Sequence, residues 1–129
     1  MLRVLDRYGF ARDEIFAIRM AVEEGLANAI IHGNRSNPTA LVHILFCINP
    51  KTFTISIGDE GKGFDPDAVS ASADGEHPKQ PHQSGLMLMR RFMHAVRFNA
   101  TGNAVTLERR RSSPSSQAGD LSGSSCRNR

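Results

Sequence analysis

Apolar side chains recur at three- and four-residue steps between Asp13 and Asn34, and this spacing predicts one amphipathic helix. Asp13 is the expected N-cap of this helix, and the Gly33-Asn34 pair suits its C-terminal exit. The apolar stripe consists of Ile15, Ile18, Val22, Leu26 and Ala29 or Ile30. This helix is the element around which we interpret the rest of the chain.

A second stripe on the same helix carries Glu24, Asn28 and His32, one turn apart. Apolar residues flank it: Met20, Ala21 and Ile31. A carboxylate and a carboxamide bordered by apolar side chains are typical of one wall of a polar pocket. The alternative is a surface helix whose polar residues face water, which is the commoner case for helical charge runs.

The following segments predict two antiparallel hairpins and one further helix. A buried strand is expected first, and the next strand alternates apolar with hydroxyl residues. A helix with a broad apolar face precedes the second hairpin, and residues 1–12 suggest a short helix. The expected elements are strands at Ala40–Ile48 and Thr52–Ile57, a helix at Gly85–Val96, and strands at Val96–Asn99 and Ala104–Glu108.

The second strand runs directly into a loop that contains Asp59, Gly61 and Gly63. Glycines permit backbone conformations closed to other residues and let a ligand approach closely. A carboxylate at a strand end accepts hydrogen bonds only, which suits an exocyclic amine such as that of adenine. A string of this kind is otherwise often no more than a turn.

Residues 67–73 are predicted to form a short helix, and residues 74–84 a polar and mobile lid. His77 and His82 in this lid lack a partner cluster, so we interpret them as solvated rather than metal-bound. The helix expected after Gly85 would direct free backbone N–H groups at whatever the lid covers, which is a seat for phosphate. Its methionines fit core packing better than a cofactor site.

The composition fits one domain with a single core. No apolar run approaches the ~20 residues of a membrane span, and no secretory leader opens the chain. From Arg109 onward there are five arginines against one aspartate, so residues 1–108 have a net charge near −1. We therefore expect no direct nucleic-acid binding. Cys47 and Cys126 make no disulfide framework by spacing, which favours the cytoplasm.

Taken together, these motifs resemble the GHKL superfamily of histidine-kinase-like ATPases. The motif Ala-Val-Glu-Glu followed by Asn-Ala-Ile-Ile-His-Gly is similar to the corresponding motif of the bacterial anti-sigma-factor serine kinases. The resemblance covers roughly residues 13–108 and implies an α+β fold. That fold is a two-layer sandwich in which helices cover one face of a mixed, largely antiparallel sheet. It implies an ATP-binding domain over 1–108 and a disordered Ser/Arg-rich tail over 109–129.

The resemblance also implies a role for each matching residue, with ATP and Mg²⁺ as the bound groups. Asn28 would hold the Mg²⁺ that bridges the phosphates, and Glu24 would be the catalytic base for an acceptor serine. Asp59 would bind the adenine amine. The remaining positions that would contact the nucleotide are Gly61, Gly63, Gly85, Leu86 and Asn103.

The implied function is an ATP-dependent serine/threonine-protein kinase that phosphorylates an anti-anti-sigma partner of the STAS type and sequesters a sigma factor. It would act in the cytoplasm, without contact to a membrane, and its formation of a homodimer stays open. Gln83 stands where the family has the first glycine before the third helix, and Asn103 replaces a threonine. Gln83 favours the alternative of a non-catalytic, ATP-binding sequestering module. A detached catalytic module of a sensor histidine kinase is the other alternative.

Overall fold

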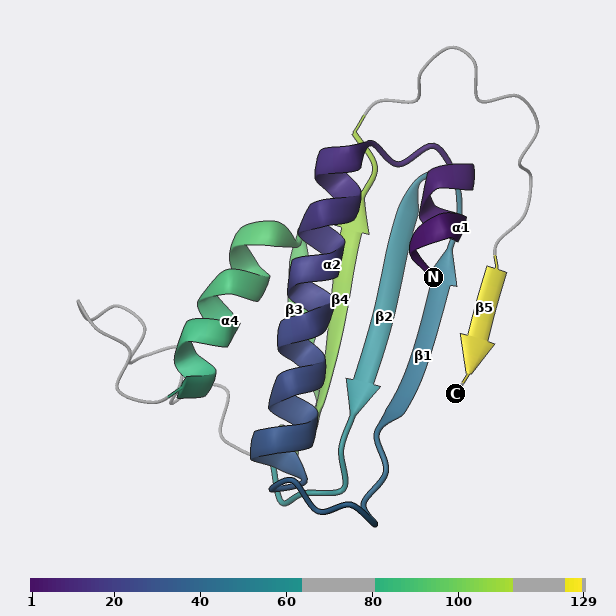
Figure 1. Cartoon of the computed structure of the whole chain (residues 1–129). Coiled ribbons are helices and arrows are strands. Elements are labelled where there is room, and N and C mark those ends of the chain that lie inside the picture. The colour runs from purple at the N-terminus through teal and green to yellow at the C-terminus, as the bar shows by residue number, and fades with distance from the viewer. Residues whose placement is uncertain (64–80, 113–124, 129) are drawn as a thin grey trace.

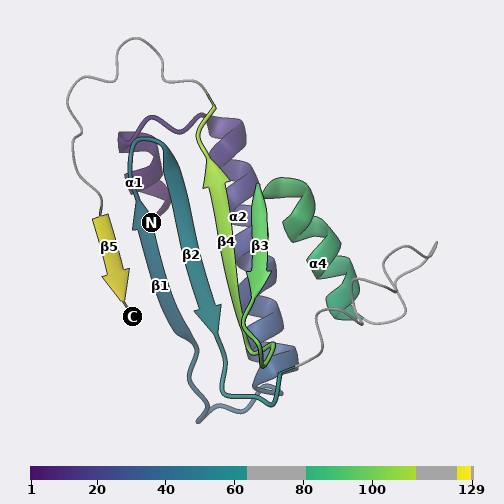
Figure 2. The ribbon, with the colours of Figure 1, turned by 180° about the vertical axis from the view of Figure 1, so that it is seen from behind.

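The computed structural model describes residues 1–63, 81–112 and 125–128. The predicted helix over 67–73 and the lid residues 74–80 lie outside the described residues, as do 113–124 of the predicted tail. The described chain forms two layers, a sheet and the helices that cover one of its faces (Figure 1; Figure 2). This is the α+β sandwich that the resemblance predicted.

Five strands form the described sheet in the order β3-β4-β2-β1-β5, and every pairing between them is antiparallel. The two predicted hairpins are β1–β2 and β3–β4, joined in the sheet by pairing of β2 with β4. The strands are β1 (His43–Ile48), β2 (Thr52–Gly58), β3 (Ala95–Phe98), β4 (Ala104–Arg110) and β5 (Ser125–Asn128).

The helices are α1 (Leu2–Arg7), α2 (Arg12–Ala27), the π-helix η1 (Asn28–Gly33) and α4 (Pro81–Phe92). The long helix of the prediction is present as α2 continued by η1. Its N-cap is Ala11 rather than Asp13, because the buried Glu14 carboxylate reaches back to accept the Ala11 N–H (3.2 Å). Within the described residues, no helix combines the length and the apolarity that a membrane span requires.

The core lies between the helices α1, α2 and α4 and the covered face of the sheet. Small residues let α2 approach the strands closely: a Cβ atom at Gly25 would lie 2.8 Å from the Cδ1 atom of Ile57. Met89 and Met93 are buried in this core, as the sequence predicted. Its fully buried large side chains are Leu5, Ile18, Ile48, Phe53, Ile55, Ile57, Leu86, Met89 and Leu107, each of which contributes about 1.5–3 kcal/mol on burial.

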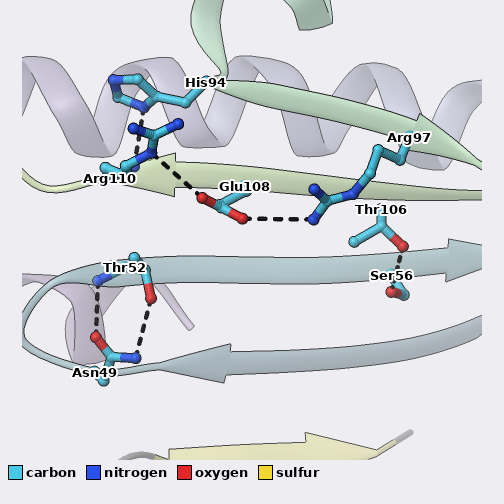
Figure 3. Close-up of polar contacts among 8 residues, drawn as sticks. All are labelled: Asn49, Thr52, Ser56, His94, Arg97, Thr106, Glu108 and Arg110. Carbon is cyan, nitrogen blue, oxygen red and sulfur yellow. Dashed lines mark hydrogen bonds and ion pairs between the residues drawn. The ribbon is translucent and has the colours of Figure 1, made fainter.

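The open face of the sheet carries polar side chains that contact one another across the strands (Figure 3). The hydroxyls of Ser56 and Thr106 lie 2.8 Å apart. Glu108 pairs with Arg97 at 3.5 Å and with Arg110 at 3.4 Å. Because both arginines are largely exposed, water screens these ion pairs and they add little stability. This polar pattern suits a sheet face that none of the described helices covers.

Helix α4 begins and ends about four residues earlier than the predicted Gly85–Val96. Proline suits the first helical position, where its missing N–H is no loss. The helix stops at Phe92 because the chain then joins the sheet, where the His94 N–H donates to the Glu108 carbonyl (2.8 Å). Arg109 donates to the Phe92 carbonyl (2.5 Å) and so satisfies a group at the helix end.

The segment predicted as a tail differs from the expectation at both of its described parts. Strand β4 continues to Arg110, and the Arg111 N–H then donates to the Lys51 carbonyl (2.8 Å). Residues 125–128 pair with the outer edge of β1, which places Cys126 directly opposite Cys47. Cys47 is disulfide-bonded. The disulfide overturns the expectation of reduced cysteines. The spacing of the cysteines could not indicate it, because the strand pairing depends on a register between distant segments.

Candidate functional site

A cavity of about 580 Å³ lies where η1 ends and where the loops after β2 and before β4 meet. Five of the predicted site residues line it: Asn28, Asp59, Gly61, Gly63 and Asn103. They come from one helix and two loops that are far apart in the sequence. The fold therefore brings most of the predicted set to one place.

Asp59 follows the last residue of β2, and its backbone N–H donates to the Asn103 carbonyl (2.8 Å). Its Oδ1 atom accepts the Gly61 N–H at 2.8 Å. Burial raises the pKa of the Asp59 carboxyl, and the Gly61 N–H opposes this by stabilising the charged form. A partly desolvated acceptor beside a cavity is suited to bind an N–H donor of a ligand.

Glycines surround this carboxylate because there is no space for side chains. A Cβ atom at Gly33 would overlap the Asp59 carboxylate, and one at Gly61 would overlap the Gly33 carbonyl. Gly63 has a φ of +79° and lies against the Thr101 carbonyl, so it also requires glycine. Two of these three positions were in the predicted set, and Gly33 was predicted only as a helix end.

The amide of Asn103 connects the second hairpin to the loop after β2. Its Nδ2 donates to the Gly61 carbonyl at 3.4 Å, while its Oδ1 accepts from Asn99 at 2.7 Å. The Asn99 Oδ1 in turn accepts the N–H groups of Gly102 and Asn103. Asn103 therefore shapes the cavity wall through hydrogen bonds to the chain itself.

Glu24 and Asn28 lie one turn apart at the junction of α2 and η1, and both face Gly85 of α4. A Cβ atom at Gly85 would lie 2.7 Å from Glu24 Oε2 and 3.2 Å from Asn28 Nδ2. The π-turn that starts at Asn28 is closed by the Asn34 N–H, which donates to the Ala29 carbonyl (2.8 Å). Such turns often mark functional sites in helices.

Two predicted residues are placed differently from the expectation. Because α4 starts at Pro81, Gly85 and Leu86 lie in its second turn, where a regular helix pairs their N–H groups internally. The Leu86 side chain is buried in the core. These residues were predicted to begin the helix with free N–H groups, and that boundary is wrong. Their contact with a nucleotide stays a prediction.

The sequence reasoning missed several cavity residues in the turn that follows η1. Asn34, Arg35, Asn37 and Thr39 line the cavity, as does Lys62 beyond Asp59. Arg35 and Ser36 have positive φ values of 51° and 56°, which is uncommon outside glycine. The available signal was the run of polar residues directly after Gly33, which we interpreted only as a turn.

Asn28 offers an amide oxygen and Glu24 a carboxylate beside Gly85, and Mg²⁺ prefers oxygen ligands. Within residues 1–63, 81–112 and 125–128, no group of three or more His, Cys, Asp or Glu residues could hold a metal ion. A magnesium ion bound mainly by phosphate oxygens and water needs only one or two protein ligands. The amide oxygen of Asn28 therefore fits a metal ion that is bound mainly by the nucleotide.

The chain is similar to one known protein family and to several curated proteins. The family described as histidine kinase-like ATPase domain matches residues 1–109. The serine-protein kinase RsbW of Oceanobacillus iheyensis is 29% identical over 102 residues, which are 74% of this chain and 65% of that protein. An anti-sigma F factor of Halalkalibacterium halodurans is 32% identical over 95 residues, covering 66% of this chain and 60% of that protein.

A further relative, the anti-sigma F factor of Clostridium beijerinckii, is 30% identical over 105 residues. This match covers 76% of the present chain and 72% of the relative. The chain spans less than two thirds of the length of the first two relatives. The likeness thus concerns the ATPase domain, and their names describe longer proteins.

Proposed function

The chain belongs to the histidine kinase-like ATPase family, and within it to the anti-sigma-factor group; from this membership we propose that it is an ATP-dependent protein serine kinase. Its substrate is an anti-anti-sigma protein of the STAS type, and it also sequesters a sigma factor. We keep the cytoplasm as its proposed place of action because of the family membership alone, since the disulfide of Cys47 removes the argument from reduced cysteines. Names of relatives such as serine-protein kinase RsbW and serine/threonine-protein kinase BtrW support the kinase activity.

One observation carries the proposal: Glu24 and Asn28 face the same glycine, Gly85, while Asn28 also lines the cavity beside Asp59. Phosphoryl transfer depends on positioning and on charge neutralisation next to the reacting phosphate. A base and a metal ligand one turn apart meet that requirement, provided that the nucleotide base lies at Asp59. A simple solvated helix face would not bring Asn28 to a cavity and Glu24 against the neighbouring helix α4, although Glu24 itself is not part of the cavity lining.

In this proposal the Asp59 carboxylate accepts a hydrogen bond from the exocyclic amine of adenine. Asn28 contributes an oxygen ligand to Mg²⁺, and Gly61, Gly63 and Asn103 shape the wall beside the base. Gly85 and Leu86 lie on the phosphate side. When bound, Mg²⁺–ATP supplies the phosphoryl group and neutralises its negative charge.

Glu24 acts as the base in the transfer. The serine oxygen of the partner forms a bond to the γ-phosphorus as the bond from that phosphorus to the oxygen of ADP breaks, and the hydroxyl proton passes to the Glu24 carboxylate. The products are phosphoserine and ADP. Gly85 leaves room for this carboxylate, since any side chain at that position would contact its Oε2 atom.

The test combines nucleotide binding with phosphoryl transfer. We expect titration calorimetry to show clear ATP binding that Mg²⁺ strengthens, and labelled ATP to phosphorylate serine in a purified STAS partner. A protein that binds ATP and a sigma factor but labels no partner would be the sequestering module that Gln83 favours. Label on histidine would indicate a histidine kinase module. Absence of ATP binding would reject both the serine kinase and the histidine kinase hypotheses.

A further inference from the structure

A buried asparagine joins three segments at the cavity end of the molecule. The Asn34 Nδ2 donates to the Leu41 carbonyl at 3.0 Å, and the Asn34 Oδ1 accepts the Glu60 N–H at 2.8 Å. The Glu60 carboxylate accepts the Leu41 N–H at 2.6 Å. We call these three contacts among Asn34, Leu41 and Glu60 the Asn34 bridge.

The burial of Asn34 shows that the bridge is specific. Its side chain is in a residue only 8% exposed, although it follows a helix end and precedes an exposed turn. A buried amide is costly unless both its donor and its acceptor are satisfied. Here each is used once, and the backbone N–H of Asn34 is held by the Ala29 carbonyl. The residue is therefore fixed in position and orientation.

The contact to Glu60 acts on the loop that carries Asp59. Asn34 holds the N–H of the peptide directly after Asp59, and the Gly61 N–H holds the Asp59 carboxylate itself. On the other side, Gly33 packs so closely that a Cβ atom would overlap this carboxylate. Because Gly33 and Asn34 are consecutive, one helix end fixes the Asp59 loop both by contact and by a hydrogen bond.

We propose that Asn34 is a positioning residue that sets the preference for adenine, because it holds the Asp59 carboxylate in the direction that accepts the exocyclic amine. The inference rests on the proposed function, since it requires a nucleotide with its base at Asp59. A role in folding alone would make no difference between one purine base and another. The preference between bases is therefore the property to measure.

The experiment compares ATP with ITP, whose base carries an oxygen in place of the amine. We expect the parent protein to bind ATP more tightly than ITP. Asn34→Ala should weaken ATP binding about tenfold, because it removes a hydrogen bond that positions the Asp59 loop. ITP binding should stay nearly unchanged. Asn49→Ala is the matched control: the Asn49 side chain makes hydrogen bonds to Thr52 in the turn between β1 and β2, outside the cavity lining, so both nucleotides should bind as they do to the parent.

A second variant separates positioning from folding. Asn34→Asp keeps an acceptor for the Glu60 N–H but loses the donor to Leu41, so it should lose stability and still prefer ATP. If Asn34→Ala does not fold, this variant decides alone: loss of the ATP preference overturns the positioning role. Equal weakening of ATP and ITP in Asn34→Ala also overturns it. A parent protein that binds neither nucleotide overturns the proposed function itself.

Discussion

The two ends of α2 both gather polar groups, but they use them in opposite ways. At the C-terminal end, Asn28 and Asp59 line a cavity. At the N-terminal end, polar groups from distant segments bond to one another. The Glu14 carboxylate accepts the Ser112 N–H at 3.0 Å, and Arg111 donates to the carbonyls of Pro50 (2.6 Å) and Gly9 (3.2 Å).

This difference separates stability from binding. Glu14 is 2% exposed, and Arg109 donates a hydrogen bond to the Phe92 carbonyl. The polar groups at the N-terminal end therefore join distant segments of the chain to one another. One atom there, the Arg109 Nε, is buried without a hydrogen-bond partner among the described residues. At the cavity end, Asp59 bears a destabilised charge that a ligand donor could stabilise. Substitutions at the two ends should therefore affect different measurements.

The largest expected effect is at the cavity end, in Glu24→Gln. This change keeps the shape of the side chain and removes its basicity, so transfer to the acceptor serine should slow at least a hundredfold, or about 2.7 kcal/mol. ATP affinity should stay nearly unchanged. A single-turnover assay with labelled ATP measures the rate, with Glu23→Gln as control, because exposed Glu23 pairs with Arg19 one turn earlier on the same helix. Equal rates in both variants would remove Glu24 as the base.

Asp59→Asn tests the other function of the cavity. The amide can present a donor toward the adenine amine, so ATP binding should weaken by about 1.5–3 kcal/mol. Burial raises the pKa of Asp59, which means that the ionised form is disfavoured in the folded protein. The neutral variant should thus unfold at the same or a higher temperature. Calorimetry and thermal unfolding check both, beside Asp6→Asn in α1; unchanged ATP binding would place the base elsewhere.

Glu14→Ala should show the reverse behaviour at the N-terminal end. It leaves the N–H groups of Ala11 and Ser112 without their carboxylate acceptor. The expected loss is about 1–3 kcal/mol in the free energy of unfolding, measured by urea denaturation, with ATP affinity per folded molecule unchanged. Asp13→Ala, at an exposed position in the same helical turn, should cost much less. A selective loss of ATP binding in Glu14→Ala would contradict the separation of the two ends.

The smallest effect should be the pH dependence due to His94. Burial and the charges of Arg109 and Arg110 lower the pKa of His94, opposed by Glu108 and Glu14. Its Nδ1 accepts the Arg110 N–H at 2.9 Å and must be unprotonated to do so. A folded-state pKa below the unfolded value means that this contribution to stability is complete above about pH 6.5 and is lost as the pH falls through the folded pKa.

Thermal unfolding at several pH values, from about pH 7.5 to about pH 5.5, measures this contribution. His94→Gln keeps an acceptor for the Arg110 N–H but cannot be protonated, so its unfolding temperature should fall less on acidification than that of the parent. Identical slopes for the two proteins would show that His94 does not contribute.

Local patterns were sufficient to predict the long helix, both hairpins and four of the positions that line the cavity: Asn28, Asp59, Gly61 and Gly63. Periodicity indicates which face of α2 is buried, and glycines beside a strand-end carboxylate indicate a close approach. The start of α4 was not predictable from the apolar face alone, because the helix begins at Pro81, before that face. Pairing of β5 with β1 depends on a register between segments about eighty residues apart, which no local pattern encodes.

The Asn34 bridge was missed for a similar reason. An asparagine after a helical glycine is an ordinary helix end, and nothing near it in the sequence indicates burial. Its partner Glu60 lies 26 residues away. By contrast, Asn103 was named through a family resemblance, although its hydrogen bonds join it to Gly61, 42 residues away. Roles that depend on such distant contacts require either a structure or a relative.

The contacts around Glu14 and Gly9 also determine when the domain can be completed during synthesis. Glu14 and Ser112 are separated by 98 residues, and Gly9 and Arg111 by 102. The central strand β2 likewise acquires its second neighbour only when β4 has been made. A growing chain therefore emerges from the ribosome with one edge of β2 unpaired. Until β4 has been made, this unpaired edge is prone to aggregation and is a target for chaperones.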